Sequence, residues 1–280
     1  MPGRAVAWCL HCRALVKLPS ISVVTPCMNA ATTIQETLES VRAQGYPRVE
    51  HIVVDGGSTD RTPELLASMP HVRWISEPDR GRVDAANKGV GMATGDVIAW
   101  LNADDRYEPG ALHAVGQALA ENPRAAWATG YCGIIDGGGR EIRRAVTAYK
   151  NFLLRHWSVG LYLTQNFVSD PATFVRRSAL EEVGVLDPRY ARSHDYDLWL
   201  RVARRFGAPI VLHRLLASFR MAEGTLSMGG FEDQFAEHAE VARAHGQGHP
   251  AAVALNQAMS FLIVTVYRTL RLRRRLRPQP

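Results

Sequence analysis

Cysteine is scarce in this chain, which has four cysteines in 280 residues. They stand at Cys9, Cys12, Cys27 and Cys132, too few and too unevenly spaced for a disulfide framework. This usage favours a reducing cytosol. Cys9 and Cys12 have the spacing of a zinc knuckle, but a structural zinc site needs four ligands and no second Cys or His pair stands nearby. We therefore expect ordinary small side chains at these two positions.

The sequence also lacks a long uninterrupted hydrophobic run. The apolar stretch Ala5–Leu10 is ended by His11 and Arg13, and it is too short for a convincing signal peptide. The stretch Ala251–Tyr267 contains Asn256 and other polar residues. Because a membrane-spanning helix needs ~20 apolar residues, neither stretch predicts one.

Acidic residues are absent after Glu240, and this absence accounts for the formal net charge of +6. Residues 1–267 are formally neutral, and the excess positive charge lies in the arginines that follow. We therefore do not expect the folded body to bind nucleic acid. The arginines form either a solvated tail or a peripheral contact with the anionic inner face of a membrane, where the apolar side of Leu255–Val266 lies in the interface. The arginines concerned are Arg268, Arg271, Arg273, Arg274, Arg275 and Arg277.

Two common signatures of catalytic sites are missing: a Walker phosphate loop and a His-Glu-x-x-His zinc helix. The fragment Gly89–Gly91 lacks the third glycine of a dinucleotide-binding loop. What is present is an ordinary composition, with 46% hydrophobic and 21% charged residues. These values are typical of soluble globular domains.

Strand patterns alternate with helix patterns in the first part of the chain, which predicts an α/β fold with a mostly parallel, Rossmann-like sheet flanked by helices. Ligands of such sheets bind at the carboxyl ends of the strands. Asn29, Asp55 and Asp104 each follow a predicted strand closely, so we expect them at one edge. The predicted strands are Ile21–Pro26, Glu50–Asp55, Val72–Ser76 and Asp96–Leu101, and the helices between and after them include Val83–Ala93 and Pro109–Glu121.

The alternation of strand and helix patterns ends after residue 125. Ala126–Ile135 and Arg140–Val146 flank three glycines, a pattern that predicts a hairpin. An irregular stretch follows, with helices predicted at Ser178–Val183 and Asp195–Phe206, and the chain is helical again from Phe231. We accordingly divide it into an N-terminal extension (1–19), a first half of alternating strands and helices (20–125), a less regular second half (126–230) and a C-terminal helical segment with a basic tail (231–280).

The strongest chemical signal is the cluster of Asn102, Asp104 and Asp105 at the end of a buried strand. An ionised carboxylate there is costly unless a positive charge meets it. Mg²⁺ or Mn²⁺ binds one or two carboxylates and completes its shell with substrate phosphates and water. The alternative is a solvated turn that caps the helix after Pro109.

Four blocks now occur in an order that resembles the family 2 glycosyltransferases, inverting enzymes of the GT-A fold. The resemblance covers roughly residues 21 to 219 and implies a transferase acting in polysaccharide biosynthesis at the cell envelope. The blocks are Ile-Ser-Val-Val-Thr-Pro-Cys-Met-Asn29, Val-Val-Asp55-Gly-Gly-Ser-Thr-Asp60, Asp79-Arg-Gly-Arg-Val-Asp84-Ala-Ala-Asn87-Lys88-Gly89 and Trp-Leu-Asn102-Ala-Asp104-Asp105.

The resemblance implies roles for individual residues on the donor side. Asp55 holds the nucleotide base, with Thr25, Pro26 and Asn29 in the same pocket. Asp84 and Lys88 belong to the nucleotide site, Lys88 offsetting phosphate charge, although a surface lysine is an equal alternative. Asp104 matches the last acidic position of the Asp-x-Asp metal motif and Asn102 its first. Affinity for Mn²⁺ or Mg²⁺ then rests mainly on Asp104 and the donor diphosphate.

The block from Ser193 to Arg201 resembles the acceptor-side block of the family, in which an acidic pair precedes an aromatic-rich helix. His194 replaces the usual glutamate, which leaves Asp195 as the general base; its alternative is a helix N-cap. His194 and Trp199 are placed on the acceptor side, and Trp199 either stacks on a sugar or packs the helix against the sheet.

Together these residues imply a metal-dependent inverting glycosyltransferase. It moves a sugar from a nucleotide-diphosphate donor, with a UDP-sugar favoured, to a hydroxyl of a glycan or lipid-linked acceptor. We expect it in the cytoplasm, with peripheral contact at the inner face of the membrane as an extension of this view. The alternatives are a catalytically silent nucleotide-sugar-binding protein and a sugar nucleotidyltransferase, whose glycine-rich opening is absent after the first strand.

Overall fold

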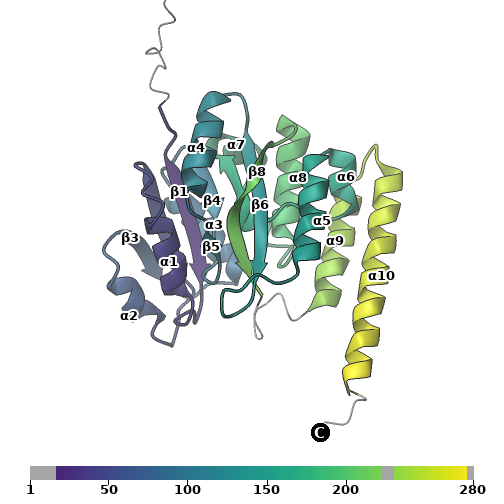
Figure 1. Ribbon diagram of the computed structural model, residues 1–280, viewed down its shortest axis with the longest axis horizontal. Helices are drawn as coiled ribbons and strands as arrows, with labels where there is room; N and C mark the ends of the chain where they lie inside the picture. The colour runs from purple at the N-terminus through teal and green to yellow at the C-terminus, as the bar shows by residue number, and fades with distance from the viewer. Residues whose placement is uncertain (1–16, 222–229, 276–280) are drawn as a thin grey trace, which may run out of the picture.

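The computed structural model describes residues 17–221 and 230–275. One mixed sheet forms the centre, in the strand order β3-β2-β1-β4-β7-β6-β8-β5, with helices on its faces (Figure 1). This confirms the expected α/β class. The strands are β1 (Ile21–Cys27), β2 (Val49–Asp55), β3 (Val72–Ser76), β4 (Val97–Trp100), β5 (Arg106–Tyr107), β6 (Trp127–Ile135), β7 (Thr173–Arg176) and β8 (Ile210–Arg220).

The first four strands make the parallel half of the sheet, because β1 pairs in parallel with both β2 and β4, and β2 with β3. Strands β1, β2 and β4 are short, largely buried runs rich in β-branched residues, which suits a sheet covered on both faces, whereas β3 at the edge is mostly exposed or half-buried. The register sets Cys27 beside Asp55 and Asp55 beside Ser76 at the carboxyl edge. The helices of this half are α1 (Ile34–Arg42), α2 (Thr62–Ala67), α3 (Arg82–Met92) and α4 (Ala111–Glu121).

The second half continues the same sheet across residue 125. Strand β7 runs antiparallel between β4 and β6, and β8 runs parallel to β6. The expected hairpin is shorter than predicted: Ile135 and Glu141 form one antiparallel bridge and the amide of Ile142 donates to the backbone oxygen of Ile134, but a helix begins at Arg144 in place of the rest of the second strand. The helical elements of this half are α5 (Arg144–Arg155), α6 (Val159–Thr164), the 3₁₀ turn η1 (Asp170–Ala172), α7 (Arg177–Val183) and α8 (His194–Phe206).

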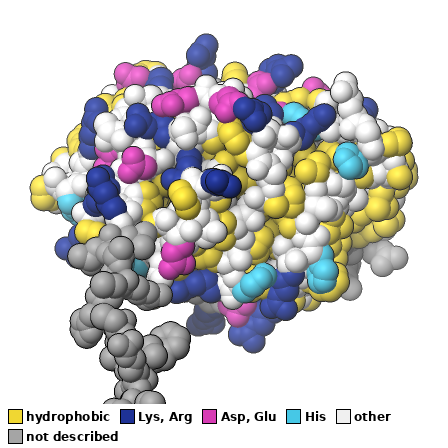
Figure 2. Space-filling model, turned by 90° about the horizontal axis from the view of Figure 1, so that it is seen from above, with side chains coloured by type: hydrophobic (Ala, Val, Ile, Leu, Met, Phe, Trp, Pro, Cys, Tyr) yellow, Lys and Arg dark blue, Asp and Glu magenta, His cyan; other side chains and the backbone are white. Residues whose placement is uncertain are grey.

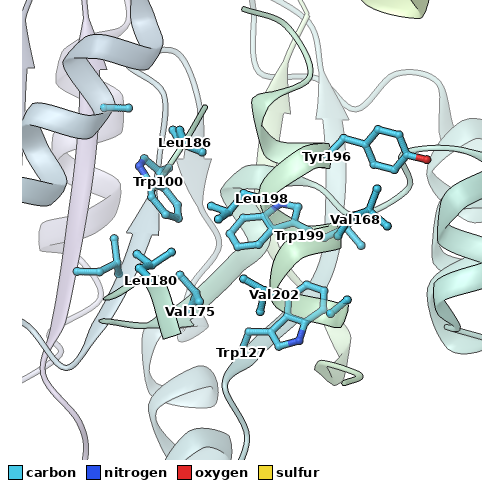
Figure 3. Close-up of a cluster of buried hydrophobic side chains, with 14 of the residues drawn as sticks. Trp100, Trp127, Val168, Val175, Leu180, Leu186, Tyr196, Leu198, Trp199 and Val202 are labelled. Atoms are coloured by element: carbon cyan, nitrogen blue, oxygen red, sulfur yellow. The ribbon is translucent and has the colours of Figure 1, made fainter. Parts of the chain in front are cut away.

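Three tryptophans from the two halves pack in the core (Figure 3). The ring of Trp199, on α8, lies 5.8 Å from that of Trp100 and 5.8 Å from that of Trp127. Aromatic contacts of this kind add to the free energy of burial by about 0.5–1.5 kcal/mol each. The cluster therefore fixes α8 against the end of β4, which is where the acidic turn begins.

Two further helices, α9 (Phe231–His245) and α10 (Pro250–Arg275), form the C-terminal segment. Val241 and Ala242 of α9 are buried, and Figure 1 shows α10 at the outer edge of the molecule. Among the described residues, no helix has the length and apolar character that crossing a membrane requires. Arg268 of the basic tail forms an ion pair with Glu232 at 2.7 Å. Cys9, Cys12 and the end of the tail lie outside the described residues.

Figure 2 looks onto the amino-terminal ends of β1 and β4, opposite to the edge where the polar clusters gather. Lys and Arg are interspersed with Asp and Glu on this face. Hydrophobic side chains line its right-hand flank, on the side where α10 lies in Figure 1. The exposed apolar residues of α10 are Leu255, Phe261, Leu262 and Val266.

Candidate active site

Asp55 ends β2 with its side chain fully buried. Its carboxylate accepts hydrogen bonds from the backbone amide of Ser58 at 3.0 Å and the hydroxyl of Ser76 at 2.6 Å. The Ser58 hydroxyl and the Cys27 thiol also donate to it. Asp55 therefore organises the turn after β2 and presents no surface to a ligand, which corrects the expected direct contact with a nucleotide base.

Thr25 and Pro26 of β1 are also buried, and the Thr25 hydroxyl lies 2.9 Å from the Nε2 atom of His51. The expectation that their side chains line a nucleotide pocket is wrong, because neighbouring strands cover both. Asn29, in contrast, is exposed and has a positive φ of 50°. Its side-chain oxygen accepts a hydrogen bond of 2.9 Å from the backbone amide of Thr59. Asn29 thus joins the loop after β1 to the loop after β2.

The carboxylate of Asp79, which sequence reasoning missed, lies beside the turn that Asp55 holds. A Cβ atom on Gly56 would come within 2.3 Å of its Oδ2 atom, so only glycine fits there without a shift of this side chain. Its Oδ1 atom accepts a hydrogen bond of 2.7 Å from the amide of Gly81. Asp79 is half-buried, so it retains surface at the nucleotide side of this edge.

Asp84 and Lys88 form a local ionic network on α3. Lys88 Nζ lies 2.8 Å from Glu77 and 3.5 Å from Asp84. Hydrogen bonds from the backbone and the guanidinium of Arg80 lower the pKa of Asp84. This network holds the loop before α3, and the expected contacts of Asp84 and Lys88 with a nucleotide stay predictions.

The turn after β4 contains one buried and one available carboxylate. Asp105 is 1% exposed, and it accepts hydrogen bonds from the side-chain amide of Asn102 at 2.8 Å and the backbone amide of Arg220 at 2.9 Å. Burial and the neighbouring Asp104 raise its pKa well above the usual range. Asp105 therefore anchors the turn, while the Asp104 carboxylate has no partner in another described residue.

Arg220, at the end of β8, donates hydrogen bonds to this turn. It was not identified from the sequence. Its guanidinium is 3% exposed and donates to the backbone oxygen of Asp104 at 2.8 Å. It also donates to the backbone oxygen of Asp136 at 3.1 Å and to the carboxylate of Glu36. A buried guanidinium requires this degree of pairing, so Arg220 fixes the backbone from which Asp104 projects.

Burial raises the pKa of Asp104, and Arg82 and Arg220 oppose that shift. No group of three or more His, Cys, Asp or Glu side chains among the described residues is arranged to hold a metal ion. The carboxylate of Asp104, two residues after Asn102 in the same turn, nevertheless suits Mg²⁺ or Mn²⁺, which complete their coordination with substrate phosphates and water. The donor set thus fits a cation that arrives with a diphosphate.

Arg82, on α3, connects the acidic turn to α8. Its guanidinium donates to the side-chain oxygen of Asn102 at 2.8 Å and lies 2.5 Å from the Nε2 atom of His194. An arginine can only donate, so Nε2 of His194 is an acceptor and the proton of this imidazole is on Nδ1. Burial, aided by Arg82, lowers the pKa of His194 to about 4, which keeps the ring neutral. Arg82 stands in the third block of the resemblance, but the sequence alone assigned it no role.

Asp195 lies in the first turn of α8 and lines a cavity together with Arg82 and Asn102. Its Oδ2 atom accepts a hydrogen bond of 3.0 Å from the side-chain amide of Asn166. The N-cap position belongs to Ser193, so the alternative role of Asp195 as a helix cap is wrong. Asp170 lines the same cavity, and burial, with a contribution from Asp195, raises its pKa to about 7.

Trp199 is completely buried in the core cluster shown in Figure 3. The expectation that it stacks on an acceptor sugar is therefore wrong, and the alternative that it packs α8 against the sheet is confirmed. His194 is 2% exposed and reaches the site through its contact with Arg82. The cavity that Asp195 lines has Asn166 and Asp170 in its wall, and neither Trp199 nor His194.

Comparison with known sequences identifies the same family that the motifs resemble. Residues 22–184 match the model of "Glycosyl transferase family 2", which is more than half of the chain. An uncharacterized glycosyltransferase of Mycobacterium tuberculosis is 31% identical over 211 residues, covering 73% of this chain and 76% of the relative. The succinoglycan biosynthesis protein ExoO of Rhizobium meliloti is 36% identical over 133 residues, covering 46% of this chain and 38% of that protein.

Solved structures share the fold at low sequence identity. S. aureus TarS 1–349 in complex with UDP-GlcNAc has a TM-score of 0.63 at 16% identity, covering 86% of this chain and 71% of that one. The mannosyltransferase PcManGT of Pyrobaculum calidifontis, in complex with GDP-Man and Mn²⁺, has a TM-score of 0.59 at 18% identity, with 91% and 81% covered. With the family model and the mycobacterial relative, these likenesses show that the chain belongs to glycosyltransferase family 2 and is a glycosyltransferase of the GT-A fold.

Proposed function

We propose that this glycosyltransferase inverts the anomeric carbon as it transfers a sugar from a nucleotide-diphosphate donor to an acceptor hydroxyl, with Asp195 as the general base. The observation that carries the proposal is the shared cavity: Asn102 from the turn after β4 and Asp195 from α8 line it together, with Arg82 between the two halves. Inversion needs one base opposite the leaving group. In this proposal Asp195 is that base, and the turn that contains Asn102 faces the leaving group.

Asp195 is suited to take the acceptor proton. Asn166 holds its Oδ2 atom, which fixes the carboxylate and leaves Oδ1 to face the acceptor. Asp170 beside it has a pKa of about 7, so it carries a proton for much of the time near neutral pH. The pair therefore offers a base and a neighbouring hydrogen-bond donor.

On the donor side, Asp104 and the side-chain oxygen of Asn102 are the residues that would hold Mn²⁺ or Mg²⁺. Such a cation supplies Lewis-acid stabilisation of the departing diphosphate, worth several kcal/mol. Arg82 adds a fixed positive charge at the same wall. The Mn²⁺ in the PcManGT structure supports this assignment for the fold.

The donor is a nucleotide sugar, for which a UDP-sugar is our first choice and a GDP-sugar the second, since related folds hold UDP-GlcNAc and GDP-Man. Asp79 and Asn29 are the nucleotide-side residues with exposed surface. The acceptor is a glycan or a lipid-linked glycan, and the name of the rhizobial relative supports a role in polysaccharide biosynthesis. We place this reaction in the cytoplasm.

Peripheral contact with the inner face of the membrane is part of this proposal. The outer side of α10 exposes Phe261 and Leu262, which are 75% and 62% exposed, ahead of the basic tail. An apolar stripe beside clustered arginines is the pattern of an interfacial helix. A lipid-linked acceptor would be presented at the same surface.

The decisive experiment replaces Asp195 by Asn. Turnover should fall by roughly a hundredfold or more because the base is lost, while the dissociation constant of the donor with Mn²⁺ stays within about twofold. Donor affinity is measured by calorimetry and transfer by product formation. Loss of donor binding, or full turnover, would contradict the role of Asp195.

A further inference from the structure

The cavity beside Asp195 extends away from the donor side to the C-terminal helices. It has a volume of about 400 Å³, within the range of small-molecule sites. His238 of α9 and Asn256, Met259 and Ser260 of α10 line its far end. All four lie beyond residue 184, where the match to the family model stops. This end of the cavity is therefore built by residues outside the shared domain.

Three residues that line this cavity each carry a buried polar atom with no hydrogen-bond partner within the described part of the chain. The atoms are Nε2 of His238, Oδ1 of Asn256 and Oδ1 of Asp170. His238 is 7% exposed and Asn256 is 1% exposed. A buried polar atom without a partner costs about 1–3 kcal/mol. Three such atoms in residues of one cavity wall indicate a ligand that supplies the missing bonds.

The chemistry of these atoms selects the ligand. Asn256 directs its amide nitrogen to the backbone oxygen of Thr164 at 3.2 Å, so its free Oδ1 atom accepts. Burial lowers the pKa of His238 to about 4, which makes its ring neutral near pH 7. The oxygen atoms of Asn256 and Asp170 disfavour an anionic group, and burial lowers the pKa of Lys150, which lines the same cavity and opposes them less than a surface lysine would. Neutral hydroxyl groups, which both donate and accept, match all three atoms.

Part of the remaining wall at this end is apolar. Phe235, Met259 and Ile263 contribute it, each from α9 or α10. A sugar ring has hydroxyls at its rim and C–H groups on its faces, so it suits a cavity with polar atoms on one side and apolar side chains on the other. A purely apolar ligand would leave the three polar atoms unpaired.

We propose that this cavity binds the terminal, uncharged sugar ring of the acceptor, and that α9 and α10 determine which acceptor is used. The proposal rests on the proposed function, because it places the acceptor hydroxyl at Asp195. His238, Asn256 and Asp170 hold the hydroxyls that do not react. The family domain then supplies the donor chemistry, and the C-terminal helices supply acceptor selection.

Binding of octyl glycosides tests this inference without turnover. A panel of octyl glucoside, galactoside, mannoside and N-acetylglucosaminide is examined by saturation-transfer NMR, with UDP and Mn²⁺ present. The wild-type chain should bind at least one of them. Ser260→Phe, which fills the cavity, and Asn256→Leu, which removes the accepting oxygen, should each weaken that binding by about tenfold or more.

Gln257→Leu is the matched control, because Gln257 neighbours Asn256 on α10 but is exposed. It should bind the glycoside as the wild type does, and all variants should unfold within a few degrees of it. Failure of every glycoside to bind the wild type, or unchanged binding in Ser260→Phe and Asn256→Leu, overturns the inference. The affinities for UDP-GlcNAc and GDP-mannose, measured in parallel, report on the proposed donor chemistry separately.

Discussion

Arg82 donates a hydrogen bond of 2.8 Å to the side-chain oxygen of Asn102, the residue at the first position of the metal motif. A carboxylate at this position would bring a second negative charge next to Asp104. In this chain the position is the neutral amide of Asn102, which accepts a hydrogen bond from the guanidinium of Arg82. Positive charge at this wall therefore comes in part from the protein itself, and we expect Arg82 to neutralise part of the charge of a donor diphosphate bound there.

Replacing Arg82 by Gln should lower kcat/KM by roughly 10- to 100-fold, because a preorganised cation facing the diphosphate is lost. Arg82 also lowers the pKa of Asp104, so its removal should move the acidic limb of the pH profile to higher pH. Arg82→Lys, which keeps the charge but not the two-pronged geometry, should recover part of the activity. A pH profile of kcat/KM that is unchanged in Arg82→Gln would refute this role.

Asn102→Asp should strengthen the dependence on a divalent cation. The new carboxylate adds an oxygen ligand of the kind Mg²⁺ and Mn²⁺ prefer, so half-maximal activity should be reached at a severalfold lower Mn²⁺ concentration. Titration of activity with MnCl₂ measures the effect. Asn102→Ala is the companion variant, and it should need more Mn²⁺ than the wild type. Identical titration curves for the three proteins would exclude residue 102 from the metal site.

Arg220→Met should destabilise the fold by roughly 3 kcal/mol, because it leaves the buried backbone oxygen of Asp104 without a donor. Urea unfolding gives the free energy. Arg189→Ala is the control, since the Arg189 side chain is 75% exposed where it pairs with Asp187, and surface pairs contribute about 0–1 kcal/mol. Equal losses of stability in the two variants would show that Arg220 does not hold the turn.

Asp170 predicts a pH dependence of stability with a defined sign. Its pKa of about 7 in the folded protein lies above the ordinary value of 3.8, so the folded state binds the extra proton between these two values. Its contribution to stability is therefore present at low pH and is lost as the pH rises towards 7. Asp170→Asn removes this loss.

Urea unfolding of wild type and Asp170→Asn at about pH 5 and about pH 8 measures the difference. The variant should gain stability relative to the wild type as the pH rises between these two values. A constant difference between the two proteins would mean that Asp170 ionises normally in the fold.

The sequence alone determined the parallel half of the sheet and the edge where polar residues follow the strands. Buried β-branched runs, such as Ile52–Val54, and the helices between them form through local periodicity, so their positions could be predicted. The chemical motif at Asp104 and the position of Asp195 in the first turn of a helix were identified in the same way. These features depend on neighbours within a few residues in the chain.

Only the tertiary structure decided the rest. Strand β7 inserts antiparallel between β4 and β6, and this pairing depends on contacts between residues distant in sequence. The same holds for Arg82 and Arg220, whose partners lie 20 to 184 positions away. Burial of Thr25, Asp55 and Trp199 likewise follows from what packs over them, because a side chain suited to a ligand is equally suited to a core when its partners come from other strands and helices.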